Sequence, residues 1–168
     1  SEAQTIQAQL HAIGVRPEDI DIVVNSHLHF DHCSNNTLFP QATFYFSKSE
    51  LRHAHVPDPW ERLGYDPALV AIDGMKTELL ELGHFEYEVL PGITLIETAG
   101  HSVGHLSAII DTGDGRAPLV FPFDVAYTRH NLEHKVLMGL HSDPRELLDS
   151  MVRIENIAKK IGGEIFFS

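Results

Sequence analysis

The amino-acid sequence predicts an α/β sandwich, in which helices cover sheets of mixed strand order. Four short apolar runs separated by turn signals follow one another between residues 84 and 123, as in an antiparallel sheet. Helical patterns with an apolar stripe stand before and after these runs. A chain of 168 residues can bury one sizeable core, so we expect a single domain over residues 1–168.

The N-terminal part of the chain predicts helices that alternate with strands. Its stretch 'VPDPWERLGYDP' is rich in proline and turn formers and predicts a loop or mobile flap. The other expected elements are a helix from Glu2 to Ile13 with Ile6, Leu10 and Ile13 on one stripe, a buried strand from Ile20 to Asn25, a strand over residues 42–47 and a helix from Lys48 to about His55.

The C-terminal part predicts an antiparallel sheet followed by a long helix. The strands are expected over residues 84–90, 93–99, 105–112 and 117–123, with turns at Pro91 and at residues 113–115. Asp143 is expected to cap a helix that ends near residue 161. The side chains of this helix that are expected to face the core are those of Leu147, Leu148, Met151, Ile154 and Ile157. A final buried strand is expected over residues 162–168.

Composition excludes several classes of partner. The formal net charge is −12, so we expect no binding to nucleic acid or to an anionic membrane surface. No apolar run reaches the length of a membrane span. Cys33 is the single cysteine, which rules out an internal disulfide and favours a cytoplasmic location. We expect Cys33 to be a small packed residue.

The stretch 'SHLHFDHC' gathers four potential metal ligands, His27, His29, Asp31 and His32. Twelve histidines that fall in clusters are the compositional mark of a metal site. We expect a turn after the buried strand to carry them, because in a helix Asp31 and His32 would diverge. Imidazole and carboxylate suit zinc and similar divalent metals, and this spacing suits two metals better than one. The alternative is four polar residues on a solvated loop.

Two later segments point to the same place. 'TAGHSVGH' puts His101 between glycines in a tight turn, where backbone can approach a metal closely. 'VFPFD' ends a buried strand on Asp124, an anion at the mouth of a sheet. Either residue alone would more often be structural. Together with the preceding cluster, they are expected to be metal ligands.

The segments 'SHLHFDH', 'AGHSVGHLS' and 'FPFDVAY' together resemble the metallo-β-lactamase superfamily, whose HxHxDH motif is among the more specific short signatures. Phe30 and Tyr127 resemble the N-acyl-homoserine lactonase, or quorum-quenching lactonase, branch. The resemblance covers nearly the whole chain and implies an αββα sandwich. It also implies a dinuclear centre, with zinc the most expected metal and cobalt, manganese or iron as alternatives. In that centre one metal would be held by His27, His29 and His101, the other by Asp31 and His32, and both would be bridged by Asp124.

The resemblance further implies a hydrolytic mechanism. A hydroxide between the two metals would attack the carbonyl of a lactone. Tyr127 would donate a hydrogen bond to the developing oxyanion, unless it only packs beside the site, and Asp31 could pass the proton onward. His105 would support the site through a hydrogen bond to its neighbours.

Compared with the family, the chain looks truncated at both ends. The N-terminal strands and a C-terminal strand and ligand segment, with a further histidine just after 'EIFFS', are expected but missing. Two substitutions are smaller departures. Phe123 stands where glycine usually precedes the bridging aspartate, and Val103 stands where proline is common. Neither removes a ligand.

Outside these motifs, residues receive weaker assignments. His53, His55 and His84 are expected at the surface, and His141 is expected to be structural rather than a substitute ligand. On the flap, an acyl chain could be covered by Trp60, Leu63, Tyr65 and Leu69.

Three functions stay open. The leading one is a metal-dependent hydrolase of carboxylic esters that opens the lactone ring of N-acyl-homoserine lactones, small neutral molecules that suit an acidic protein. The second keeps the site but acts on another ester, a thioester or a phosphotriester. The third is a non-catalytic, truncated metal-binding remnant. A homodimer is compatible with each of them.

Overall fold

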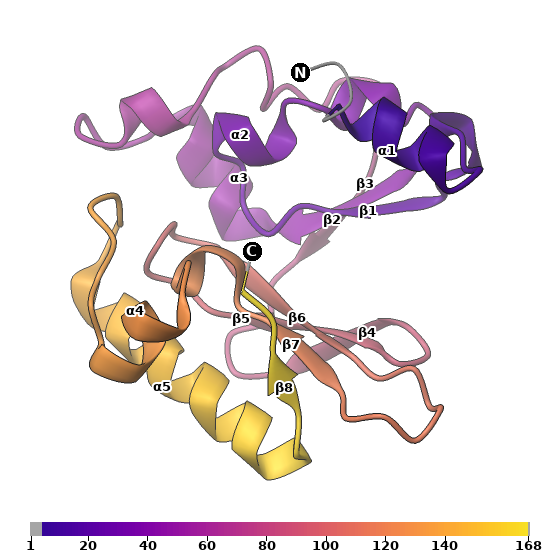
Figure 1. Ribbon diagram of the computed structural model, residues 1–168. Helices are drawn as coiled ribbons and strands as arrows, with labels where there is room; N and C mark the ends of the chain where they lie inside the picture. Colours follow the sequence, from indigo (N-terminus) through magenta and orange to yellow (C-terminus); the bar gives the residue numbers. More distant parts are fainter. Residues whose placement is uncertain (1–4, 168) are drawn as a thin grey trace.

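Two β-sheets lie face to face, and each carries helices on its outer side (Figure 1). This arrangement, seen in the computed structural model, confirms the expected αββα fold class. The structure describes residues 5–167. The first sheet has three parallel strands, β1 (Ile22–Val24), β2 (Thr43–Ser47) and β3 (Lys76–Leu80), in that order.

The second sheet has five strands in sequence order, antiparallel up to the fourth of them. They are β4 (Glu86–Leu90), β5 (Ile93–Glu97), β6 (Leu106–Ile110), β7 (Leu119–Phe121) and β8 (Glu164–Ile165), which runs parallel to β7. The predicted succession of antiparallel strands is therefore confirmed.

The outer layers consist of helices (Figure 1). On the side of the first sheet lie α1 (Ile6–Ala12), α2 (Phe30–Cys33) and α3 (Lys48–His55), and on the side of the second lie α4 (Arg129–His134) and α5 (Pro144–Ile161). Short 3-10 turns occur at Pro17–Asp19, Asn36–Leu38, Arg62–Gly64 and Phe123–Val125. None of the helices within residues 5–167 is long and apolar enough to cross a membrane.

Three hydrophobic clusters fill the spaces between the four layers, because side chains alternate between the two faces of each strand. In β2, Phe46 packs in the first hydrophobic cluster, on the helical side of the first sheet, whereas Tyr45 packs in another cluster, between the sheets. In β5, Leu95 lies between the sheets and Ile96 packs toward α5. Both faces of these strands are covered, so the strands read as nearly continuous apolar runs.

Helix α5 begins where it was expected to begin. The Asp143 side chain accepts hydrogen bonds from the backbone N–H groups of Arg145 (2.7 Å) and Glu146 (3.0 Å). Gly162 ends the helix in the left-handed conformation, with φ 65°.

One face of α5 packs against the second sheet (Figure 1). Leu147, Met151 and Ile154 are fully buried. The inward placement of Leu148 was wrong: it is 36% exposed, because a turn of about 100° per residue places it on the flank of the buried stripe. Ile157 is only partly buried.

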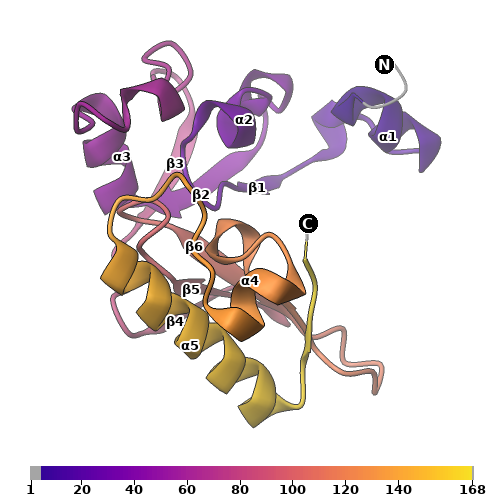
Figure 2. The ribbon, with the colours of Figure 1, turned by 60° about the vertical axis from the view of Figure 1, so that its left-hand side comes forward.

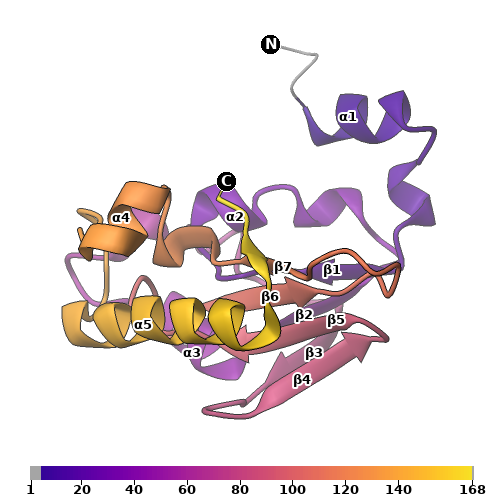
Figure 3. The same ribbon diagram turned by 60° about the horizontal axis from the view of Figure 1, so that its bottom comes forward.

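The N-terminal helix is shorter and more exposed than expected. It begins at Ile6, where the Thr5 hydroxyl accepts a hydrogen bond from the backbone N–H of Ala8, and none of its residues is buried. Glu2 lies outside the described residues. Leu10 packs against the first hydrophobic cluster, but Ile13 is 74% exposed. Figures 2 and 3 show α1 projecting away from the sheets, so little of the fold covers it.

Other differences concern polar or peripheral elements. The strand expected over residues 20–25 is confined to β1 and is only half-buried. β3 and α4 were not expected, and each contributes one buried residue, Leu80 and Leu132. β8 was expected to be buried, but it is not, because it lies at the edge of its sheet and pairs with β7 alone.

Candidate metal centre

The loop after β1 and helix α2 carry the four ligand candidates of the first motif. His27 and His29 lie in the loop, and His29 is the N-cap residue of α2. Asp31 and His32 lie within the helix, where only a turn was expected. Because α2 is a single turn, these two side chains do not diverge: Nε2 of His32 lies 3.5 Å from Oδ2 of Asp31.

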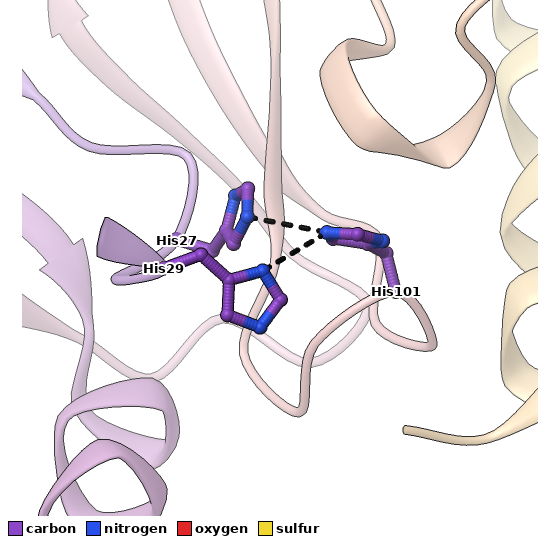
Figure 4. A group of neighbouring side chains, drawn as sticks. All are labelled: His27, His29 and His101. Atoms are coloured by element: carbon purple, nitrogen blue, oxygen red, sulfur yellow. Dashed lines mark hydrogen bonds between the residues drawn. The ribbon is translucent and has the colours of Figure 1, made fainter. Parts of the chain in front are cut away.

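Three imidazole rings converge beside this loop (Figure 4). His101 lies in the turn between β5 and β6. Its Nε2 atom is 3.2 Å from Nε2 of His27 and 3.1 Å from Nδ1 of His29. None of the three residues is more than 3% exposed. The fold thus brings two segments that are distant in sequence to one buried point.

Burial keeps these three imidazoles neutral. It holds the pKa of His27 well below its ordinary value and lowers the pKa of His29 and of His101 to about 4. The Nδ1–H group of His101 donates a hydrogen bond of 3.0 Å to the carbonyl oxygen of Leu140. The Nε2 atom of His101 is therefore unprotonated, and its lone pair faces the other two rings.

A divalent cation fits this donor set. The single lone pair on Nε2 of His101 cannot accept full hydrogen bonds from both neighbouring rings. The hydroxyl oxygen of Ser26 lies 3.1 Å from Nδ1 of His27 and can accept a hydrogen bond from a proton on Nδ1. With the proton there, the Nε2 atom of His27 has a lone pair that can bind a metal. Neutral imidazole nitrogens are preferred ligands of zinc, so His27, His29 and His101 form a candidate metal site.

A second group of ligand atoms adjoins the first. Asp124 follows β7, and its Oδ2 atom lies 3.4 Å from Nε2 of His32 and 3.3 Å from Nε2 of His101. The ligand atoms of His27, His32 and Asp124 all lie within 4.8 Å of one another. Asp124 therefore contacts one histidine of each ligand group. Asp31 belongs to neither group, and its ligand role stays a prediction.

Charge at this second group is shared between His32 and Asp124. Burial disfavours the ionised form of Asp124, but the hydrogen bond and the charge of His32 outweigh burial and hold the pKa of Asp124 below its ordinary value. Burial likewise disfavours protonated His32, but Asp124 and Asp31 outweigh it and raise the pKa of His32. Each of the two side chains thus favours the charged form of the other.

His105 lies behind Asp124 and is fully buried. Its Nε2 atom accepts a hydrogen bond of 3.3 Å from the backbone N–H of Asp124, and its Nδ1 atom lies 2.9 Å from the hydroxyl of Thr98. Burial lowers the pKa of His105 to about 3. The neighbouring Phe123 has φ 47°, a left-handed conformation that glycine adopts more easily, which explains why glycine suits this position in the resembled family.

Tyr127 lies at the rim of the site. It is 41% exposed, and its ring centroid is 6.5 Å from that of His101. Burial and then the Asp124 carboxylate raise the pKa of Tyr127 to about 12, so the hydroxyl keeps its proton at neutral pH.

The flap lies differently from the expectation. Tyr65 is buried in the core, whereas Trp60 is 66% and Leu63 93% exposed. Leu63, Tyr65 and Leu69, together with Phe30, line a surface pocket of about 380 Å³.

Glu50 and Glu61 are buried near the site, and no sequence pattern predicted their burial. The surface placement of His53 was wrong, because its side chain is only 14% exposed and its Nε2 atom lies 2.8 Å from Oε2 of the buried Glu61. The other oxygen of Glu61 accepts a hydrogen bond from Ser142. No local pattern marks these contacts, since their partners come from separate segments.

The remaining minor assignments agree with the structure. His55 and His84 are exposed. His141 approaches the carbonyl oxygen of Met138 (2.8 Å) and belongs to neither ligand group. Cys33 is buried in the first hydrophobic cluster, and burial raises the pKa of its thiol to about 11.

The curated relatives of this chain include N-acyl homoserine lactonases from different bacteria. The chain is 31% identical over 172 residues to the N-acyl homoserine lactonase of Bacillus thuringiensis, an alignment that covers 99% of this chain and 62% of that protein. It is 32% identical over 155 residues to the N-acyl homoserine lactonase AttM of Agrobacterium fabrum, with coverage of 90% and 59%. The chain thus spans about three fifths of the length of these curated relatives.

Similarity extends to solved structures. One is an N-acyl homoserine lactone hydrolase with the product N-hexanoyl-L-homoserine bound at its catalytic metal centre. It matches with a TM-score of 0.86 at 30% identity, over 100% of this chain and 63% of that chain. The protein-family model described as metallo-beta-lactamase superfamily matches residues 1–157, a span that contains all the ligand candidates. Because this match covers nearly the whole chain and the strands and helices form the αββα layers, the chain belongs to the metallo-beta-lactamase superfamily.

Proposed function

We propose that this chain carries the catalytic centre of a metal-dependent lactonase that opens N-acyl homoserine lactones. The observation that carries the proposal is the convergence of neutral ring nitrogens from His27, His29 and His101 beside the Asp124 carboxylate. The choice of a lactone as substrate is supported by the relatives at about 30% identity, which are named for this activity.

Two divalent cations, with zinc the most expected, fit the donor set. They would be held by His27, His29, His101, Asp31, His32 and Asp124. Cations bound there would supply a nucleophile derived from water near neutral pH and would polarise the lactone carbonyl. The Asp124 carboxylate would offset positive charge at both positions, since it contacts residues of both ligand groups.

Three features of the chain serve ring opening. Tyr127 is protonated at neutral pH and lies at the rim, so its hydroxyl can donate a hydrogen bond to the oxyanion that forms at the carbonyl. Asp31 has a side chain that is 60% exposed beside His32, where it can carry a proton to the departing alkoxide when the ring C–O bond breaks. Buried walls around the three histidines keep bulk water from their nitrogens.

The surroundings of the site suit a neutral substrate with an apolar chain. Phe30 is 51% exposed and borders the pocket of about 380 Å³ beside the site. The pocket does not exclude a phosphotriester or a β-lactam. The net charge of −12 disfavours only those substrates that are anionic.

Rates on a substrate panel test this proposal. We expect the metal-loaded protein to give its highest kcat/KM with N-acyl homoserine lactones, compared with a simple δ-lactone, a thioester, paraoxon and a β-lactam. If a non-lactone were turned over about a hundredfold better than every acyl-homoserine lactone, the lactonase assignment would be wrong and the metallohydrolase assignment would remain.

A further inference from the structure

Glu50 is a buried carboxylate outside the metal-binding motifs. It lies in the first turn of α3, and its exposed fraction is 0%. A carboxylate in such a place is expensive to bury unless hydrogen bonds satisfy both of its oxygens. Three donors, from three different segments, meet this need.

Two of these donors belong to the two segments that carry the metal-ligand candidates. The backbone N–H of Leu28, which lies between His27 and His29, donates to Oε1 over 3.0 Å. The backbone N–H of Gly104, in the turn that carries His101, donates to Oε2 over 2.9 Å. One side chain therefore ties together the two segments whose ring nitrogens converge.

The approach of the His101 turn to α3 is close enough to demand glycine. A Cβ atom on Gly104 would lie 2.6 Å from the backbone nitrogen of Glu50 and 2.7 Å from its Cβ atom. The turn thus rests directly on the first turn of α3, with the carboxylate between them. This contact leaves little freedom for His101 to shift relative to the loop of His27 and His29.

The third donor comes from the flap. The hydroxyl of Tyr65 donates to Oε1 of Glu50 over 3.0 Å, and the Tyr65 ring lies 4.7 Å from the ring of His29. Tyr65 thus shares one oxygen with Leu28, whereas Gly104 alone of these donors holds the other oxygen. Loss of the Tyr65 hydroxyl would leave both ligand segments bound to the carboxylate.

We propose that Glu50 is a positioning residue, whose carboxylate holds the His27–His29 loop against the His101 turn so that the three ring nitrogens converge before a cation binds. This inference rests on the proposed metal centre and names the group that pre-organises it. Both oxygens of a carboxylate accept hydrogen bonds, so a single buried side chain can hold two backbone N–H groups that face it from opposite sides.

Glu50→Gln tests the proposal with nearly unchanged side-chain volume. The amide retains one acceptor oxygen, and its NH2 group must face the N–H of Leu28 or of Gly104, so one segment is released. We expect zinc affinity, measured by competition with a chelator, to fall about 10- to 100-fold. We also expect a changed visible absorption spectrum at saturating cobalt(II), because the ligand geometry changes.

Two matched variants separate positioning from stability. Leu51→Ala, at the next residue of α3, removes apolar packing from the first hydrophobic cluster and should lower the melting temperature without changing zinc affinity or the cobalt spectrum. Tyr65→Phe removes one donor and keeps both ligand segments bound, so its zinc affinity should stay within about threefold of wild type. Equal losses in Glu50→Gln and Leu51→Ala would overturn the proposal, as would unchanged affinity and spectrum in Glu50→Gln.

Amide hydrogen exchange in the wild-type, metal-free protein tests the same idea without any variant. The N–H groups of Leu28 and Gly104 should be protected before metal is added. If both exchange as fast as exposed loop amides until zinc binds, the metal orders the loops and Glu50 does not. Should Glu50→Gln not fold, or should the wild type bind no metal, slow exchange of these two N–H groups in the metal-free protein still supports the Glu50 contacts, and fast exchange still contradicts them.

Discussion

Three histidines at the candidate site and the inner face of α5 are buried to the same extent, yet the two regions are built from opposite kinds of side chain. His27, His101 and His105 are at most 1% exposed, and so are Met151 and Ile154. Around α5, buried apolar side chains pack against Val120 and Ile96. Around the histidines, burial is made tolerable by specific polar contacts, such as those from Thr98 to His105 and from Leu140 to His101.

This difference teaches that equal burial can serve two ends. The α5 face stabilises the fold through buried apolar area, at about 25 cal/mol per Å², and this contribution depends on neither protons nor metal. The histidine segments hold neutral nitrogens away from water, which costs stability in the metal-free state and leaves lone pairs of the kind that divalent cations bind. Variants, pH and metal should therefore affect the two regions differently.

Replacing the shared carboxylate should have the largest effect. We expect Asp124→Ala to abolish hydrolysis and to reduce metal retention together, because this carboxylate contacts both ligand groups. Activity on lactones and elemental analysis of the same sample provide the measurement. Asp149→Ala, the same change at an exposed position on α5, is the control. Near-normal metal content with near-normal turnover would place Asp124 outside the site.

Removing one hydroxyl at the rim should have an intermediate effect. We expect Tyr127→Phe to lower kcat on lactones by about 10-fold to 10³-fold with unchanged metal content, because an oxyanion donor acts in the transition state. Tyr87→Phe, on β4 away from the histidines, serves as the matched control. A kcat within about twofold of wild type would mean that Tyr127 only packs beside the site.

Shortening a side chain of the α5 face should move stability and leave the centre intact. Ile154→Ala is expected to lower the free energy of unfolding by about 2–5 kcal/mol, because it leaves a cavity in the cluster beneath α5. Metal content per folded chain should not change. Loss of metal in this variant, under conditions where it is folded, would show that the two regions are coupled.

Acid should destabilise the metal-free protein through the histidines. Burial lowers the pKa of His27, lowers that of His29 and His101 to about 4 and lowers that of His105 to about 3. Between about pH 6.5 and about pH 4, the unfolded chain therefore binds protons that the folded chain does not bind. Stability should therefore fall as the pH decreases through this window. The raised pKa of His32 makes the folded state more stable at low pH, but this is one histidine, whereas four histidines have the opposite effect.

Denaturant unfolding of chelator-treated protein at about pH 7 and about pH 5 measures this dependence. Ile154→Ala should be less stable than wild type at both pH values while showing the same difference between them, since no titrating group changes. Equal stability of the wild type at the two pH values would contradict the neutral, buried state of the four imidazoles.

The second sheet could be predicted from sequence because its signals are local. The turn at Pro91 and Gly92 needs a glycine: φ is 83°, and a Cβ atom there would lie 2.2 Å from the carbonyl oxygen of Asp111. β3 could not be predicted in this way. Its sequence 'KTELL' has no apolar alternation, and parallel pairing with the distant β2 makes it a strand.

In the candidate site, too, some residues could be predicted from the sequence and others could not. The histidines and aspartates stand in short motifs that together resemble a known family, so their convergence could be expected from the sequence although the three motifs are far apart along the chain. Glu50 and Glu61 could not be identified, because a glutamate near a helix start or in a proline-rich loop usually faces solvent. Their burial depends on donors such as Gly104 and Ser142 that only the tertiary fold supplies.

Metal content of the purified protein tests the metal centre most directly. After purification without chelator and equilibration with zinc, elemental analysis should give about two divalent cations per chain, because the two ligand groups adjoin at His27 and Asp124. Dialysis against a chelator should remove both cations and the proposed lactonase activity together. A content well below one cation per chain in folded, zinc-equilibrated protein would contradict a metal centre at these histidines.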